Sequence, residues 1–169
     1  MTLESDLVRR IVGLERRLAE MEARENSWFG VKIRVQRSTA QTIANNMWTA
    51  QIFDAIAYEK KPSGAASQWS LGNPTRLTCV VAGFYLVVTH VMFVANATGD
   101  RIIGLYKNGM IFANTSTRAG ASLGVSAQLV ELVSLNVGDY IESQVFQNSG
   151  GNLNTDPSNY LYLAWVLLG

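Results

Sequence analysis

The stretch that most constrains the fold of this chain runs from Gly83 to Ala95, where both faces of a predicted strand are apolar. Side chains alternate between the two faces of a strand. One face carries Tyr85, Val87, Thr89, Val91 and Phe93, and the other carries Phe84, Leu86, Val88, His90, Met92 and Val94. A sheet with one face in water alternates apolar and polar residues, so this strand is expected to contact protein on both sides. We predict that one face fills the core and that the other contacts further copies of the chain.

The composition supports this prediction and excludes several classes of partner. Only 16% of the 169 residues are charged and 48% are hydrophobic, which is enough for a core and suggests that partners cover part of the surface. The formal net charge of +1 gives no electrostatic basis for binding nucleic acid. The charged N-terminus predicts no signal peptide, and the lack of a long apolar run predicts no membrane insertion. The single cysteine, Cys79, excludes an internal disulfide.

Residues 1–26 follow a heptad pattern typical of a coiled-coil stalk. The seam consists of Leu7, Ile11, Leu14, Leu18 and Met21, and its narrowness favours a coil over a helix lying on its own domain. Flanking charges pair Arg10 with Glu15 and Arg17 with Glu22 on a neighbouring helix, which favours parallel, in-register association. Isoleucine at a and leucine at d favour two strands in general. However, RIVGLE and RLAEME resemble a motif of parallel trimeric coiled coils, and that resemblance implies a trimer.

The rest of the chain has the pattern of a mainly β protein. We interpret residues 27–46 as a linker with an extended arm, and 47–169 as a head. Asn108-Gly109 predicts a tight hairpin and Gly138-Asp139 a further turn, while 113–127 is predicted to be an exposed loop. About ten short strands without a helical period predict an antiparallel sandwich.

Several blocks of the head resemble the trimeric jelly-roll heads of the complement C1q and tumour necrosis factor superfamily. The resemblance covers about 47–169 and rests on Phe53-Asp54, the block Val81 to Tyr85, the hairpin Leu105 to Gly109, Leu132, Leu135, Gly138-Asp139 and the closing apolar strand. It implies a ten-stranded jelly roll, of which three copies pack around an axis. The residues expected in this core or trimer interface are Tyr85, Val87, His90, Val91, Phe93, Tyr160, Tyr162 and Trp165.

A short coil joined to such a head also resembles bacteriophage fibre, spike and head-appendage proteins. The stretch from Ser27 to Asp54 is similar to phage virion proteins, and the outer loops are rich in Ser, Thr and Asn. This resemblance implies a virion protein made in the host cytoplasm, held to other virion proteins by its N-terminal coil. The expected role is attachment to a host surface receptor or glycan. The alternatives are a purely structural trimer that decorates or cements a capsid or tail, and a bacterial C1q-like binding module.

The candidate ligand residues lie in predicted polar loops, namely Trp69, Asn114, Ser116, Asn152, Asn154 and Asp156. Trp69 is expected either to stack on a sugar ring or to pack at the rim of a subunit, and Trp28 and Trp48 are weaker candidates of the same kind. His90 is the only histidine. Because it has no ligating or nucleophilic companion, we interpret it as a structural residue near the threefold axis. No catalytic group, metal site or cofactor site is identified, so we expect a protein that is not an enzyme.

Overall fold

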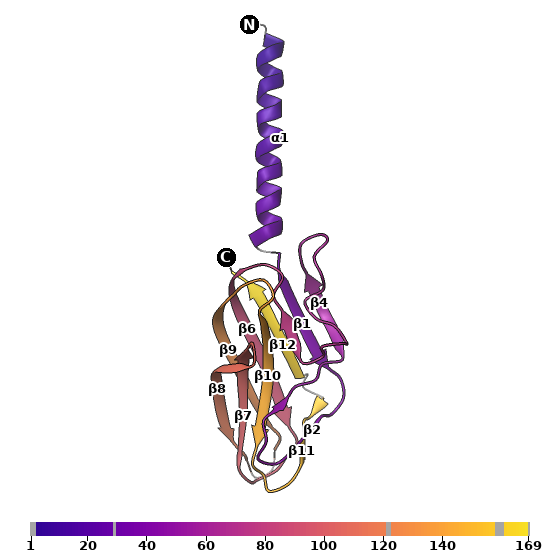
Figure 1. The fold of residues 1–169 in the computed structure, drawn as a ribbon, viewed down its shortest axis with the longest axis vertical. Coiled ribbons are helices and arrows are strands. Elements are labelled where there is room, and N and C mark those ends of the chain that lie inside the picture. The colour runs from indigo at the N-terminus through magenta and orange to yellow at the C-terminus, as the bar shows by residue number, and fades with distance from the viewer. Residues whose placement is uncertain (1–2, 29, 121–122, 158–160, 169) are drawn as a thin grey trace.

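The computed structural model describes residues 3–28, 30–120, 123–157 and 161–168 as one helix followed by a β-sandwich (Figure 1). The helix α1 (Leu3–Trp28) stands at one end of the sandwich, and the C-terminal strand reaches the same end (Figure 1). In the described part of the chain, no helix is long and apolar enough to cross a membrane.

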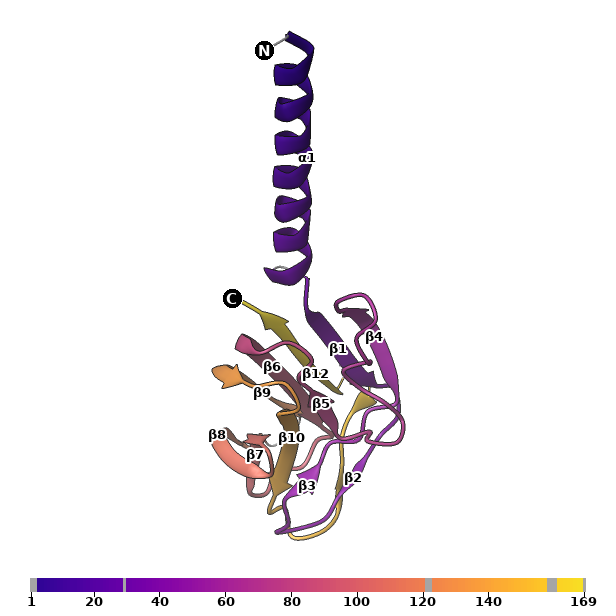
Figure 2. The same ribbon diagram turned by 45° about the horizontal axis from the view of Figure 1, so that its top comes forward.

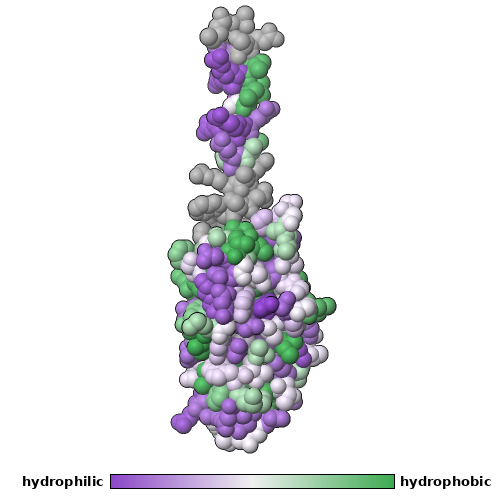
Figure 3. Space-filling view, in the orientation of Figure 1, coloured by the Kyte–Doolittle hydropathy of each residue, from purple (hydrophilic) through white to green (hydrophobic). Residues whose placement is uncertain are grey.

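The described side chains of α1, from Asp6 to Met21, are exposed except at the half-buried Gly13. Apolar and polar side chains occupy different sides of this part of the helix (Figure 3). On the polar side Arg16 and Glu20 form an ion pair with an N–O distance of 3.7 Å. A helix without tertiary packing is only marginally stable in water. The apolar side of α1 is exposed in the single chain.

Five strands form the first sheet, which continues directly from the helix. In spatial order they are β4 (Ala55–Lys60), β1 (Lys32–Arg37), β12 (Leu161–Leu167), β6 (Gly83–Phe93) and β9 (Val125–Leu135). All neighbouring pairs are antiparallel. The two-faced strand predicted from the sequence is β6, and it lies between β12 and β9.

The second sheet packs against the first, as two viewing directions show (Figure 1 and Figure 2). In spatial order its strands are β3 (Thr49–Ala50), β10 (Tyr140–Gln147), β7 (Asp100–Lys107) and β8 (Met110–Arg118). A further strand, β5 (Arg76–Thr78), pairs with the first residues of β10, and β3 pairs with later ones. A small third pair, β2 (Thr42–Ile43) with β11 (Leu153–Asn154), lies at the end opposite the helix (Figure 1). The described residues thus contain twelve strands in a mainly antiparallel sandwich, where about ten were predicted.

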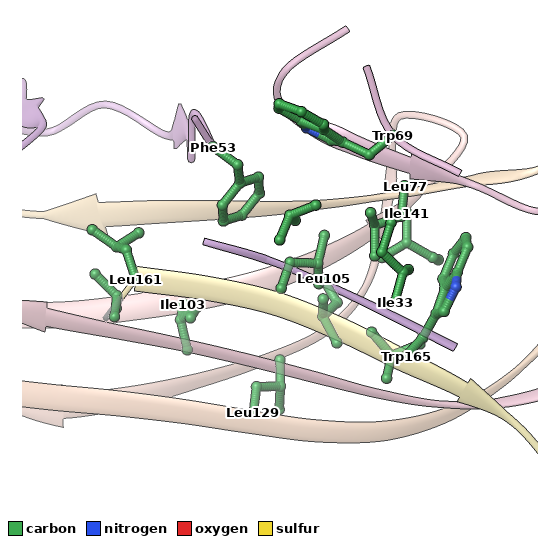
Figure 4. Packing of buried hydrophobic residues seen from close by; sticks show 14 of the residues in the cluster. Ile33, Phe53, Trp69, Leu77, Ile103, Leu105, Leu129, Ile141, Leu161 and Trp165 are labelled. Atoms are coloured by element: carbon green, nitrogen blue, oxygen red, sulfur yellow. The ribbon is translucent and has the colours of Figure 1, made fainter. Parts of the chain in front are cut away.

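The core lies between the two large sheets (Figure 4). Ile33, Leu161 and Trp165 contribute from the first sheet, while Ile103 and Ile141 face them from the second. Trp165 is anchored at its polar edge, because its Nε1 donates to the buried Gln68 Oε1 at 2.7 Å. This hydrogen bond satisfies the one polar group of a ring that is otherwise apolar.

Two segments differ from the sequence prediction. Much of the predicted linker belongs to the head, because β1 pairs with β4 on one side and with β12 on the other. The predicted loop 113–127 is also wrong in its first part, because residues up to Arg118 continue β8 and pair with β7. Small polar residues can form this strand because β8 lies at the edge of the sheet and has an exposed outer side.

The two predicted turns are confirmed. Asn108 and Gly109 join β7 to β8 with φ values of 51° and 81°. Gly138 has a φ of 90° in the turn before β10. Positive φ at both central residues is the conformation that suits a two-residue hairpin, and Asn-Gly is the sequence that adopts it most readily.

Candidate functional site

The two faces of β6 have different surroundings in the single chain. Tyr85, Val87, Thr89, Val91 and Phe93 are fully buried in the core. The alternate residues point outwards from the first sheet and are half-buried or exposed, with Phe84 60% exposed. The prediction that one face fills the core is confirmed, and the second face stands without cover in one chain.

The uncovered side chains continue across three neighbouring strands. Leu86 is paired in register with Val166 of β12 and Leu132 of β9, and Val88 is paired with Ala164 and Val130. Cross-strand partners share a face of the sheet. We call the resulting surface the apolar face. Its exposed members are Phe84, Val130, Leu132 and Leu168; Leu86, Val88 and Val166 are half-buried, and Ala164 is buried among them. Contiguous exposed apolar surface is a common feature of protein contact sites.

A polar and aromatic group borders the apolar face one pair further along the strands. His90 is paired with Tyr162 of β12 and with Gln128 of β9, and Gln128 Nε2 lies 3.5 Å from the Tyr162 hydroxyl. The Arg34 guanidinium carbon lies 4.0 Å from the centre of the Tyr162 ring. Arg34 Nε is buried and has no hydrogen-bond partner among the described residues. These residues provide polar groups beside the apolar face.

The predicted interface residues therefore separate into two groups. His90 and Tyr162 lie on the outer face of the first sheet, beside the apolar face. Five others lie in the core of the single chain, which is one of the two places predicted for them: Tyr85, Val87, Val91, Phe93 and Trp165. Tyr160 lies outside the described residues.

Tyr85 has a structural role at the helix end of the core. Its hydroxyl donates to Val81 O at 2.6 Å and contacts Cys79 Sγ at 3.7 Å. Burial raises the pKa values of both the Tyr85 hydroxyl and the Cys79 thiol, so both groups stay neutral at physiological pH. Buried neutral groups of this kind pack the core and are not reactive.

Among the described residues, none covers the seam predicted for α1. Leu7, Ile11, Leu14, Leu18 and Met21 are all exposed. Arg10, Glu15 and Arg17 are exposed beside them, and the side chain of Glu22 lies outside the described residues. Arg16 and Glu20 pair on the side away from the seam, so this ion pair leaves the seam open.

The predicted ligand residues fall in three separate places. Trp69 is only 8% exposed, and its Nε1 donates to Pro74 O at 3.2 Å, so the expectation of a sugar-stacking ring at this position is wrong. Asn114 and Ser116 lie exposed on the outer face of β8 and not in a loop. The remaining three lie near the end opposite the helix, where Asn152 and Asn154 are exposed and Asp156 is half-buried.

Interactions within the end opposite the helix hold its loops in place. The buried Arg101 donates to Thr98 O at 3.0 Å and to Asn96 Oδ1 at 3.2 Å. Burial lowers the pKa of this guanidinium from its very high ordinary value. Asn154 Oδ1 accepts from Thr42 Oγ1 at 2.8 Å, which ties β11 to β2.

Sequence reasoning gave too little weight to Trp48, which is 38% exposed beside the second sheet. One signal was available in Gly104, a glycine inside the predicted strand 101–106. Glycine within a strand often marks a close approach by another group. In the structure that group is the Trp48 indole.

The comparisons with known proteins concern the head. No model of a known protein family matches the sequence, and no curated protein matches it. Solved structures do match. The globular domain of zebrafish complement 1qA is 13% identical with a TM-score of 0.60, and the match covers 82% of this chain and 98% of that one.

Two further structures give the same result. Murine APRIL at pH 8.0 is 15% identical with a TM-score of 0.61, covering 82% of this chain and 98% of that one. The Eiger TNF of S. frugiperda is 9% identical with a TM-score of 0.60, and the match covers 83% of this chain and 94% of that one. The head has the complement C1q and tumour necrosis factor fold. Identities in this range show the fold alone, and they confirm the jelly-roll resemblance of the sequence.

Proposed function

We propose that the protein is a homotrimeric stalk-and-head appendage of a virion, which attaches the particle to a host surface. The observation that carries the trimer is the apolar face, which is uncovered in one chain although its other side closes the core. Three copies packed around a common axis cover this face. Heads of the C1q and tumour necrosis factor fold are expected to assemble in this way.

The helix supports the same assembly. α1 leads into β1, a strand of the sheet that bears the apolar face, so stalk and head join on one sheet. Three parallel helices would bury the seam from Leu7 to Met21, and Arg10 and Arg17 would then lie near Glu15 and Glu22 of neighbouring helices. Stalk and head thus share one threefold axis.

The position of the helix suggests how the trimer is mounted. α1 is at one end of the head and the loops around 94–99 and 148–152 are at the other (Figure 1). A particle that holds the stalk leaves these polar loops and the second sheet exposed to the surroundings. Loops on a rigid scaffold commonly carry binding residues, which favours an attachment role.

A pair of leucine variants tests the trimer. Leu132→Asp places a carboxylate within the apolar face, while Leu71→Asp makes the same change at a leucine outside it; the two leucines are 62% and 75% exposed. We expect light scattering to give about 55 kDa, three times the 18.5 kDa chain, for wild type and Leu71→Asp. Leu132→Asp should approach the mass of one chain. Equal masses for both variants would contradict the proposal.

The attachment role has a separate test. Soluble trimer added before infection is expected to block adsorption of the virion that carries it. Removal of residues 1–26 should leave the head folded but absent from purified particles. Unchanged adsorption in a large excess of trimer would show that attachment lies elsewhere.

A further inference from the structure

The outer face of the second sheet holds a tryptophan over a glycine. Trp48 immediately precedes β3, the edge strand that pairs with β10, and its indole extends across β10 to Gly104 of β7. A Cβ atom at Gly104 would lie 3.2 Å from Trp48 Cζ3, which is closer than ordinary packing allows. The missing side chain therefore makes room for the ring, and more than a third of the residue remains exposed.

Two further aromatic rings hold the indole in position. Tyr106 of β7 meets it edge to face, with ring centroids 5.9 Å apart and an interplanar angle of 71°. Phe146 of β10 lies on the same face, with centroids 5.7 Å apart and an angle of 45°. A ring fixed in this way loses little conformational entropy when a ligand covers it. Trp48 is thus a rigid and accessible apolar platform.

Neutral hydrogen-bonding groups flank the platform. Gly104 is paired in register with Gln144 of β10 and with Asn114 of β8, so the three share one row across the sheet. Ser116 lies exposed two residues further along β8, on the same face, where it pairs with Ile102. Within the described part of the chain, the side chains of Gln144, Asn114 and Ser116 make no hydrogen bond, so their donors and acceptors are available.

The charged residues of this face lie away from the Trp48 ring, and Arg118 pairs with Asp100 at 3.9 Å where β8 ends and β7 begins. Glu142 of β10 is the charged residue nearest along the strand, and its carboxylate accepts from Thr75 Oγ1 at 2.8 Å. A platform of one aromatic ring with neutral amides and a hydroxyl complements a ligand with an apolar face and many hydroxyl groups. A pyranose ring has both features, because its C–H groups stack on aromatic rings while its hydroxyls bind amides.

We propose that this face is a binding site for neutral carbohydrate, in which a sugar ring stacks on Trp48 and its hydroxyls bind Asn114, Gln144 and Ser116. The site lies on the second sheet, whereas the apolar face lies on the first. This inference rests on the proposed attachment role, because the bound sugar would belong to the host surface. It moves the tryptophan that stacks on the ligand from Trp69 to Trp48.

The test is isothermal titration calorimetry with neutral trisaccharides terminating in glucose, galactose or N-acetylglucosamine, because calorimetry detects binding equally in variants that lack Trp48. In wild type, a bound sugar should also change the emission of Trp48, because the side chains of Trp69 and Trp165 are buried. We expect saturable binding of at least one trisaccharide by wild type. Trp48→Ala should weaken it at least about tenfold, and Trp48→Phe should retain part of it.

Tyr58→Ala is the matched control, because Tyr58 is an aromatic residue of the first sheet that is 48% exposed. It should bind as wild type does. Asn114→Ala should weaken binding without changing the mass of the assembly. Absence of saturable binding to all three trisaccharides, equal binding by Trp48→Ala, or binding of sialylated trisaccharides alone would each overturn the proposal.

Light scattering on the same samples separates this inference from the trimer. A mass near 55 kDa without sugar binding would overturn the carbohydrate site and leave the assembly standing. Sugar binding by a protein of 18.5 kDa would support the site and contradict the assembly.

Discussion

Tyr162 and His90 stack across the β12–β6 pair, with ring centroids 5.5 Å apart and an interplanar angle of 16°. The Arg34 guanidinium lies against the same tyrosine ring, so the group joins β1, β12 and β6 on the outer face of the first sheet. It borders the apolar face directly. The stack therefore places an imidazole and a guanidinium beside the surface through which we propose that protomers meet.

Replacement of His90 by lysine should dissociate the proposed trimer. The ammonium would lie next to Tyr162, which already contacts the Arg34 guanidinium, and three copies would bring further like charges together. A charge buried without a partner destabilises an interface strongly. His90→Gln places an uncharged polar side chain at this position and should retain the wild-type mass in light scattering at pH 8. A trimeric His90→Lys protein would place the interface away from this stack.

Asp139 should stabilise the head in a way that depends on pH. Hydrogen bonds from Asn108 Nδ2 at 2.8 Å and from the Asn136 amide at 2.8 Å, with Lys107 Nζ at 3.0 Å, lower its pKa to about 2 from an ordinary value of 3.8. Because the folded-state pKa is the lower one, this stabilisation is complete above about pH 4 and is lost as the pH falls through about 2.

Urea unfolding of wild type and Asp139→Asn over a pH series checks this prediction. The variant should be less stable at pH 7, and the difference between the two proteins should shrink between pH 4 and pH 2. A difference that stays constant over this range would show that the carboxylate charge has no role in the turn.

Thr89 should stabilise the core through its hydroxyl. It is fully buried on β6, where its Oγ1 lies 2.8 Å from Ser143 Oγ, 3.1 Å from Tyr162 O and 3.2 Å from Gln51 Oε1. Thr89→Val should lower the free energy of unfolding by about 1–3 kcal/mol, because buried polar partners lose a hydrogen bond. Thr117→Val, at a half-buried position on β8, should change it much less. Equal effects in denaturant unfolding would contradict the assignment.

Gly104→Ala should displace the Trp48 ring. The added methyl group would lie 3.2 Å from Trp48 and 3.3 Å from both Ile111 and Tyr106. These contacts are tighter than ordinary packing, so the Trp48 ring has to move to admit the methyl group. Tryptophan emission should shift to longer wavelength, because the indole gains contact with water. Unchanged emission would show that the ring does not depend on the glycine.

Leu14→Asp should loosen the stalk and leave the heads associated. Leu14 is exposed in the seam of α1, and a carboxylate there opposes helix pairing. Circular dichroism should show reduced helix content at an unchanged trimer mass. Val12→Asp is the control, because Val12 is also an exposed apolar residue of α1 but occupies heptad position b, outside the seam. Equal loss of helix in both variants would argue against a coil.

Local sequence patterns predicted the features that depend on neighbouring residues. The alternation in β6 identified a strand with one buried face, and Asn108-Gly109 identified the hairpin between β7 and β8. Both follow from backbone geometry within a few residues. The coil in α1 stays a prediction, because the exposed seam is seen in a single chain.

Non-local contacts account for what the sequence did not predict. β1 was assigned to a linker because its partner β12 lies at the other end of the sequence. Trp69 stands among polar residues, yet its indole enters the core and donates to Pro74 O. Trp48 gained significance only when the register placed Gly104 beneath it. None of these contacts leaves a periodic signal in the local sequence.

Sedimentation equilibrium of the wild-type chain at micromolar concentration tests the proposed assembly most directly. The uncovered apolar face and the open seam of α1 predict a single species of about 55 kDa, independent of loading concentration. A well-behaved species of 18.5 kDa would contradict the trimer and the appendage proposed from it.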